Sequence, residues 1–136
     1  MKPYEILEST SEMRIRVSAK NLAALFEKAL FAMFDAIVPN FSDKTQTAQY
    51  PVEVWAADRD TLLVNFLSEA LYLSDRDKIA FTTCNINELS DTHLTAVLVG
   101  TPIVSFESGE IKAVTHHGAE IREIKGTLST ELLFDL

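Results

Sequence analysis

Residues 13–37 read MRIRVSAKNLAALFEKALFAMFDAI and contain the two patterns from which the fold can be inferred. The first five residues alternate between apolar side chains and two arginines, which is the period of a half-buried β-strand. From Leu22 to Ile37 the apolar residues recur at steps of three and four, which predicts one apolar face of an α-helix. Asn21 or Ser18 can cap the start of this helix.

The rest of the chain repeats the two patterns and then changes to strands alone. Residues 52–57 predict a second strand, and Asp58 can cap a second helix whose apolar face runs from Leu62 to Leu73. Beyond Ile79 the helical period is lost, and strand segments alternate with glycine-containing or proline-containing turns. The predicted strands are 81–86, 93–99, 111–117 and 128–134, and the predicted turns are 100–102, 108–109, Gly118 and Gly126.

The order of elements defines a fold class. Strand, helix, strand, helix and then several strands predict a two-layer α+β fold. We expect one mostly antiparallel mixed sheet that is covered on one face by two helices.

Length and composition describe one ordinary domain with a net negative charge. A chain of 136 residues suits a single core, and we expect one domain over residues 1–136. The formal net charge of -8 disfavours broad direct binding of nucleic acid, because phosphate-binding surfaces are usually basic. A local basic patch at Arg14, Arg16 and Lys20 could contact something acidic, although a solvated strand face is the simpler explanation.

The sequence contains no pattern for a disulfide, for secretion or for a membrane. Cys84 is the single cysteine, so no intrachain disulfide can form, and we expect it to be a small buried residue. No apolar run is long enough to span a bilayer, and no charged-then-apolar leader opens the chain. The expected location is therefore the cytoplasm, without a membrane partner.

Polar residues gather in two places where packing does not need them. Lys112 is expected within a strand, on the same face as His116, whereas His117 points to the opposite face. The chain then ends on Asp135 and Leu136, so that a side-chain carboxylate adjoins the terminal carboxylate. Carboxylate oxygens are the ligands that hard cations such as calcium or magnesium prefer.

Each of these residues also has a plain structural explanation. A single lysine or histidine is most often exposed to solvent, and chain ends are often frayed. Glu12, at the start of the first long strand, could add a third oxygen donor. No glycine-rich phosphate loop, Gly-x-Ser-x-Gly elbow or recognisable Cys-His pair is present. The residues alone thus indicate a candidate hard-cation site without a visible catalytic centre.

Four segments of the sequence resemble the archease family over nearly the whole chain. Residues 4–8 are similar to the first strand of the family, and residues 62–73 are similar to its Leu-Leu-x-x-Trp/Phe-Leu-x-Glu-Leu-x-Tyr/Phe-Leu helix. Residues 110–117 resemble its Glu-Ile-Lys-Ala-Val-Thr-Tyr-His, with His116 in the place of tyrosine. Residues 133–136 are like its ending Val-Phe-Asp-Ile.

The resemblance implies an accessory protein rather than an enzyme. Archeases assist the GTP-dependent RNA ligase of the RtcB type in tRNA splicing and RNA repair. They promote guanylylation of the ligase and allow repeated turnover, and an older description casts them as chaperone-like modulators. The expected partner is therefore a protein, which agrees with the acidic charge of the chain.

The resemblance also implies a metal site. Glu12, Asp135 and the main-chain oxygen of Leu136 are the expected ligands of a divalent metal, with calcium the expected ion. Lys112 is the expected functional lysine, which would contact the partner or a phosphate. For this set to assemble, the tail of the chain must fold back beside the first long strand.

One segment departs from the family pattern. Residues 9–12 replace the family's His-Thr-Ala-Asp, so the histidine is lost and Glu12 is one methylene longer than aspartate. Calcium tolerates such variation better than magnesium, and we expect weakened or altered metal binding. His116 and His117 could contact the metal ligands without binding the ion themselves.

Three other functions stay open. The chain could be a chaperone-like factor with a different protein partner. It could be a diverged member of the family that has lost the metal. It could also be a metal-dependent hydrolase, which would turn over a small phosphoester without a partner.

Overall fold

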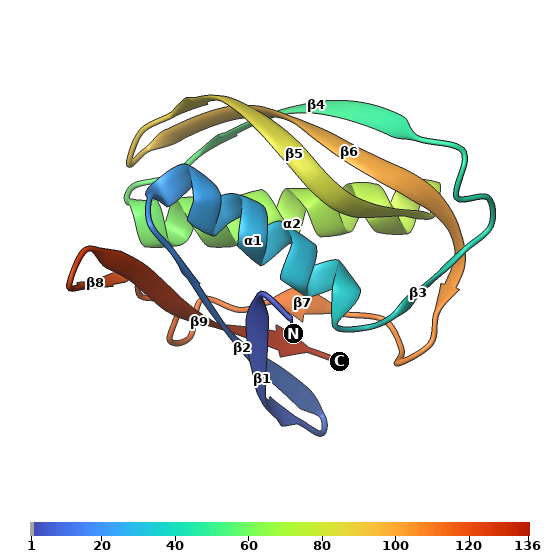
Figure 1. Ribbon diagram of the computed structural model, residues 1–136, viewed down its shortest axis with the longest axis horizontal. Helices are drawn as coiled ribbons and strands as arrows, with labels where there is room; N and C mark the ends of the chain where they lie inside the picture. Colours follow the sequence, from blue (N-terminus) through green and yellow to red (C-terminus); the bar gives the residue numbers. More distant parts are fainter. Residues whose placement is uncertain (1) are drawn as a thin grey trace.

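Two helices lie between two antiparallel β-sheets in the computed structural model of the chain (Figure 1). The structure describes residues 2–136, with the backbone alone at Ser9. In chain order the elements are β1 (Tyr4–Ser9), β2 (Glu12–Ala19), α1 (Leu22–Asp35), β3 (Pro39–Phe41), β4 (Ala48–Trp55), α2 (Arg59–Asp77), β5 (Ile79–Leu89), β6 (His93–Phe106), β7 (Ala113–Val114), β8 (Arg122–Ile124) and β9 (Thr127–Asp135).

The two sheets have separate strand orders. The first sheet has the order β1-β2-β9-β7, and β8 also pairs with β9. The second sheet has the order β3-β6-β4, and β5 also pairs with β6. Every pairing among the described residues is antiparallel. The predicted α+β class, with antiparallel strands and two helices, is confirmed.

The arrangement differs from the expected two layers in one respect, because the strands divide between two sheets and the helices are covered on both sides. Helix α1 explains this. Leu25 and Leu30 on its predicted face are fully buried, and so is Ala32, which lies off that face. The helix packs on β5 of one sheet and on β2 of the other. A helix that is apolar around most of its circumference needs cover on more than one side.

Both helices begin at predicted side-chain caps, with Asn21 and not Ser18 as the cap of α1. The Asn21 side chain accepts a hydrogen bond from the Ala24 amide at 2.8 Å. The Asp58 side chain accepts one from the Thr61 amide at 2.8 Å. These bonds satisfy amide groups that the first turn of a helix leaves without a partner.

The turn predicted at residues 100–102 is wrong, because β6 continues through it. Gly100 lies in the ladder opposite Ala48 on one side and Phe81 on the other. A Cβ atom at Gly100 would come within 2.5 Å of Ile79 Cγ2 and 2.7 Å of the Ala80 carbonyl oxygen. Glycine is therefore needed here for close approach of neighbouring strands and not for a turn.

The strand predicted at residues 111–117 is much shorter in the structure. Only Ala113 and Val114 form β7. Ile111 and Val114 are buried whereas Ala113 is exposed, so the burial does not alternate. This part of the chain packs beside α2, where Asp60 accepts a hydrogen bond from the Ile121 amide at 2.9 Å.

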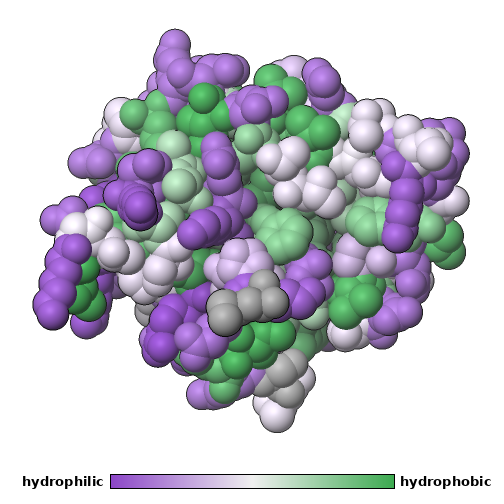
Figure 2. Space-filling model, in the orientation of Figure 1, coloured by the Kyte–Doolittle hydropathy of each residue, from purple (hydrophilic) through white to green (hydrophobic). Residues whose placement is uncertain are grey.

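The surface mixes apolar and hydrophilic residues. Figure 2 shows apolar side chains interspersed with hydrophilic ones on the face that it draws. Such a mixture is ordinary for a folded domain, because a core cannot enclose all apolar atoms. Among residues 2–136, no helix has both the length and the apolar character required to cross a membrane.

Candidate functional site

The register of β2 and β9 places Glu12 directly opposite Asp135. Met13 and Phe134, their neighbours along the two strands, form the next pair in the register and are both buried. Because successive side chains of a strand point to opposite faces, Glu12 and Asp135 both project from the outer face of the first sheet. Side chains that are directly opposite in an antiparallel pair are close enough to interact.

Two main-chain hydrogen bonds bring Leu136 and Lys112 to the same place. The Leu136 amide donates to the Ser11 carbonyl at 3.2 Å, so the tail lies beside the start of β2, as expected. The Lys112 amide donates to the Asp135 carbonyl at 2.7 Å. The structure therefore brings together the main chains of all four residues predicted for the site, from three separate parts of the sequence.

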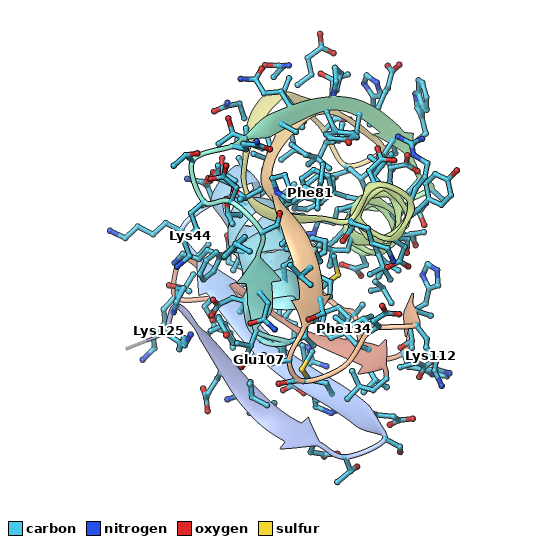
Figure 3. The ribbon with its side chains drawn as sticks, turned by 90° about the vertical axis from the view of Figure 1, so that its right-hand side faces the viewer. Lys44, Phe81, Glu107, Lys112, Lys125 and Phe134 are labelled. Atoms are coloured by element: carbon cyan, nitrogen blue, oxygen red, sulfur yellow. The ribbon has the colours of Figure 1, made fainter. Side chains whose placement is uncertain are left out.

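The Lys112 side chain is free to meet a partner. It is exposed and lies at the edge of the molecule, whereas Phe134 lies inside it (Figure 3). It forms no ion pair with any residue from 2 to 136. Lys112 and Leu136 line the same surface hollow. A lysine in this setting can offer its compact positive charge to an anionic group of another molecule.

Two acidic residues that the sequence did not indicate also line this hollow. They are Asp75, from the end of α2, and Glu110, two residues before Lys112. Burial raises the pKa of Asp75, the nearby Glu110 carboxylate adds to the rise, and Lys78 opposes it. No spacing in the sequence relates Asp75 to the tail, because only the packing of α2 beside residues 110–114 brings them together.

His116 and His117 lie outside β7 and are both exposed. His116 is close to the start of α2. Hydrogen bonds from Thr61 lower the pKa of Asp58, and the His116 ring makes a smaller contribution to the same shift. Neither histidine lines the hollow with Lys112, and support of the ligands by these residues stays a prediction.

The oxygen donors at this site are of the type that hard cations prefer as ligands. Glu12 and Asp135 are like charges directly opposite one another, an arrangement that is unfavourable without a counter-charge. Neither forms an ion pair with another residue from 2 to 136. Among the described residues, no group of three or more His, Cys, Asp or Glu side chains could hold a metal. A cation here would therefore need the main-chain oxygen of Leu136 as well as the two carboxylates.

These features define a small α+β protein in which a helix pair is enclosed by two antiparallel sheets and an acidic pair lies at the ends of two inner strands of one sheet. The family model described as "Archease protein family (MTH1598/TM1083)" matches residues 4–136, and the chain belongs to this family. The resemblance inferred from the sequence is confirmed.

Curated relatives match the chain over nearly its whole length. A protein archease of Methanosarcina acetivorans is 31% identical over 143 residues, with 99% of this chain and 97% of the relative covered. A protein archease of Methanothermobacter thermautotrophicus is 30% identical over 141 residues, with both chains fully covered.

Two solved structures share the fold. The solution structure of Methanobacterium thermoautotrophicum protein 1598 gives a TM-score of 0.69 at 25% identity, with both chains fully covered. The crystal structure of a Thermotoga maritima protein, described as an archease and possible chaperone, gives a TM-score of 0.67 at 17% identity. That match covers 96% of this chain and 94% of the other, and it bears on the fold alone.

Proposed function

We propose that this protein is a non-enzymatic activator of a GTP-dependent RNA ligase of the RtcB type. In this proposal it promotes guanylylation and turnover of the ligase during tRNA splicing or RNA repair in the cytoplasm. Membership of the archease family supports an accessory role. The net charge of -8 suits contact with a protein better than contact with RNA.

The observation that carries the proposal is the convergence of Lys112 on the acidic pair. The hydrogen bond of 2.7 Å from the Lys112 amide to the Asp135 carbonyl fixes the lysine backbone beside the β2 and β9 ends. Glu12 and Asp135 would hold a divalent cation from the outer face of the sheet, together with the Leu136 main-chain oxygen. Calcium is the proposed ion, and when bound it would supply positive charge that can offset the charge of a phosphate.

Each residue of the proposed site has a distinct role. Glu12 and Asp135 would hold the cation, and neither has a competing ion pair in the described part of the chain. Lys112 contacts a phosphate or an acidic group of the ligase as a point charge. The longer Glu12 side chain must adopt a different position from aspartate, so binding of calcium should be weaker than in relatives with aspartate.

A guanylylation assay with the purified cognate ligase and GTP tests this function. We expect Lys112→Ala and Asp135→Ala each to lower the activated rate by about tenfold or more, because each removes a charge that faces the reaction. Lys44→Ala and Asp91→Ala are matched controls, since Lys44 lies on the other side of the molecule (Figure 3) and Asp91 is exposed in a turn. Full activation by both site variants would refute the assignment.

A chaperone-like role with another protein partner is the alternative. Trp55 and Tyr72 are 62% and 58% exposed, and exposed aromatic residues are enriched at protein interfaces. Affinity capture from an extract separates the two functions. Recovery of the ligase supports the proposed function, whereas recovery of a different protein with the ligase absent supports the alternative.

A further inference from the structure

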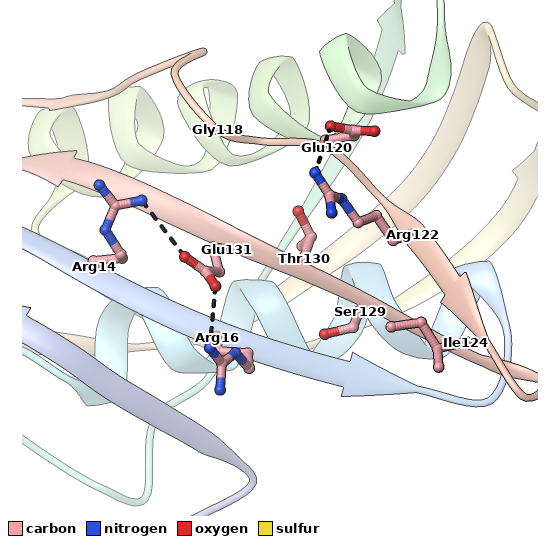
Figure 4. A pocket seen from close by; sticks show the side chains of 9 residues that line it. All are labelled: Arg14, Arg16, Gly118, Glu120, Arg122, Ile124, Ser129, Thr130 and Glu131. Atoms are coloured by element: carbon pink, nitrogen blue, oxygen red, sulfur yellow. Dashed lines mark hydrogen bonds and ion pairs between the residues drawn. The ribbon is translucent and has the colours of Figure 1, made fainter.

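A groove of about 570 Å³ lies beside β2, β9 and the segment that leads into β8 (Figure 4). Arg14 and Arg16 of β2 line it together with Arg122 of β8. Glu120 and Glu131 are the acidic side chains of its lining. Three arginines against two glutamates make the lining positive, although the chain as a whole has 12 basic and 20 acidic residues.

Arg14 has hydrogen-bond donors that no described residue uses. Its side chain is only 30% exposed, and its nearest carboxylate contact is 3.6 Å, between Arg14 Nη1 and Glu131 Oε1. That distance is too long for a hydrogen bond. A guanidinium has five N–H donors, and the half-buried Arg14 side chain keeps them within reach of solvent. The donors of Arg14 are therefore available to an acceptor that comes from outside the chain.

Arg16 and Arg122 also have N–H donors that form no hydrogen bond with a described residue. Arg16 donates to Glu131 at 3.1 Å, and Arg122 donates to Glu120 at 3.2 Å. Each guanidinium retains further N–H groups after these single bonds. Gly118 lies close to Arg14, since a Cβ atom there would be in ordinary van der Waals contact with Arg14 Nη1 at 3.6 Å.

We propose that this groove binds a nucleotide through its phosphate groups. Arginine forms paired hydrogen bonds with phosphate oxygens, and two arginines of β2 with a third from β8 suit a compact anion of several phosphates. The volume is within the range of sites for small ligands. Ile124, which is 62% exposed, lines the same groove and offers apolar surface to a base or ribose.

A compact anion fits the groove better than a long one. Extended RNA would be repelled by the remaining surface of an acidic chain, whereas a nucleotide contacts only the local arginines. Arg14 is two residues from Glu12 on the same face of β2, at a spacing of about 7 Å. The nucleotide site would therefore adjoin the acidic pair, but it rests on the arginines and does not require a cation.

Isothermal titration calorimetry of the full chain tests the nucleotide site, with ATP, GTP and inorganic triphosphate as separate probes. EDTA in the buffer keeps the result independent of the proposed metal site. We expect all three probes to bind, and Arg14→Gln or Arg16→Gln to weaken binding by about tenfold. Arg76→Gln removes the same charge outside the groove and should leave the affinity unchanged within about twofold. Thermal melting verifies that each variant is folded.

Four outcomes would overturn the nucleotide site. The first is the absence of binding by all three probes at millimolar concentration. The second is equal affinity of the folded Arg14→Gln variant and the unmutated chain. The third is equal binding of guanosine and GTP, because guanosine lacks the phosphates. The fourth is tighter binding of a single-stranded RNA oligonucleotide than of ATP, which would identify a nucleic-acid surface instead.

Discussion

Glu12 and Asp135 are register partners on neighbouring antiparallel strands, although they come from opposite ends of the sequence. Two like charges in this position repel each other. The pairing of β2 with β9 extends from Glu12 to Ala19, so buried pairs such as Ile15 with Leu132 hold the register. The core therefore imposes the acidic pair, and a bound cation would relieve its repulsion.

The first prediction concerns the stability of the acidic pair. In EDTA, Glu12→Gln should raise the free energy of unfolding by about 0.2–1 kcal/mol, because it removes the repulsion across the two strands. Calcium should raise the melting temperature of the unmutated chain but not of the variant, since an ion that binds only the folded state stabilises it. Urea unfolding and thermal melting measure both effects. A variant that is less stable than the unmutated chain in EDTA would contradict this explanation.

Periodicity in the sequence predicted most elements but not their division into sheets. The alternation of residues 13–17 and 128–134 correctly predicted two strands, and the side-chain caps at Asn21 and Asp58 correctly marked the helix starts. Alternation reports which face of a strand is apolar, but it does not report which strands pair. The burial of Ala32, off the predicted face of α1, is the signal that a second covering layer was needed.

The sequence predicted only part of the candidate site. The family resemblance correctly placed the tail beside β2, because it relates distant segments that no local pattern connects. The surroundings of Lys112 were not predictable, since residues 111–117 follow the surface of α2 and lose the alternation of a strand. Arg122 was missed in the same way, because the three residues of β8 are too short to produce a periodic pattern.

The second prediction concerns the close approach of strands at Gly100. Gly100→Ala should destabilise the fold by about 1–3 kcal/mol, because the added methyl group overlaps Ile79 and the Ala80 carbonyl. Val104→Ala is the control on the same strand, since Val104 is 72% exposed and its truncation should change stability by less than about 0.5 kcal/mol. Urea unfolding compares the two variants. Equal stability of the variants would show that the strands can move apart at low cost.

The third prediction concerns Asp35, at the end of α1. Burial alone would raise its pKa, but hydrogen bonds from Lys2 and Tyr4, each 2.7 Å long, outweigh burial, and the pKa is lowered. A lowered folded-state pKa adds stability above the unfolded value of about 3.9. That stability is lost as the pH falls through the folded-state value.

The substitution Tyr4→Phe tests whether the ionised Asp35 carboxylate stabilises the fold in this way. The variant should lose about 1 kcal/mol of stability at pH 7, because the ionised carboxylate of Asp35 loses a hydrogen bond. The loss should shrink at a pH below the lowered folded-state pKa of Asp35, where the protonated carboxyl is a weaker acceptor. Urea unfolding at the two pH values measures it, with Tyr72→Phe as the control at an exposed tyrosine. An equal loss at both pH values would indicate a packing effect instead.

The fourth prediction concerns Cys84, which is 3% exposed on β5. Burial, with a smaller contribution from Glu27, raises the pKa of its thiol to about 12. A thiol reagent at about pH 8 should therefore leave the folded protein unlabelled, because the reactive thiolate is both scarce and enclosed. One thiol should react in denaturant. Rapid labelling of the folded protein would contradict this placement.

Calorimetric titration of calcium into the metal-free protein tests the central claim, that Glu12, Asp135 and Leu136 hold a divalent cation. We predict one ion per chain, with a dissociation constant on the order of 0.1–1 mM. Asp135→Asn should weaken binding at least about tenfold, because a ligand charge is lost, while Asp91→Asn should leave it unchanged. No heat of binding at millimolar calcium, or equal binding by the Asp135→Asn variant, would contradict the claim.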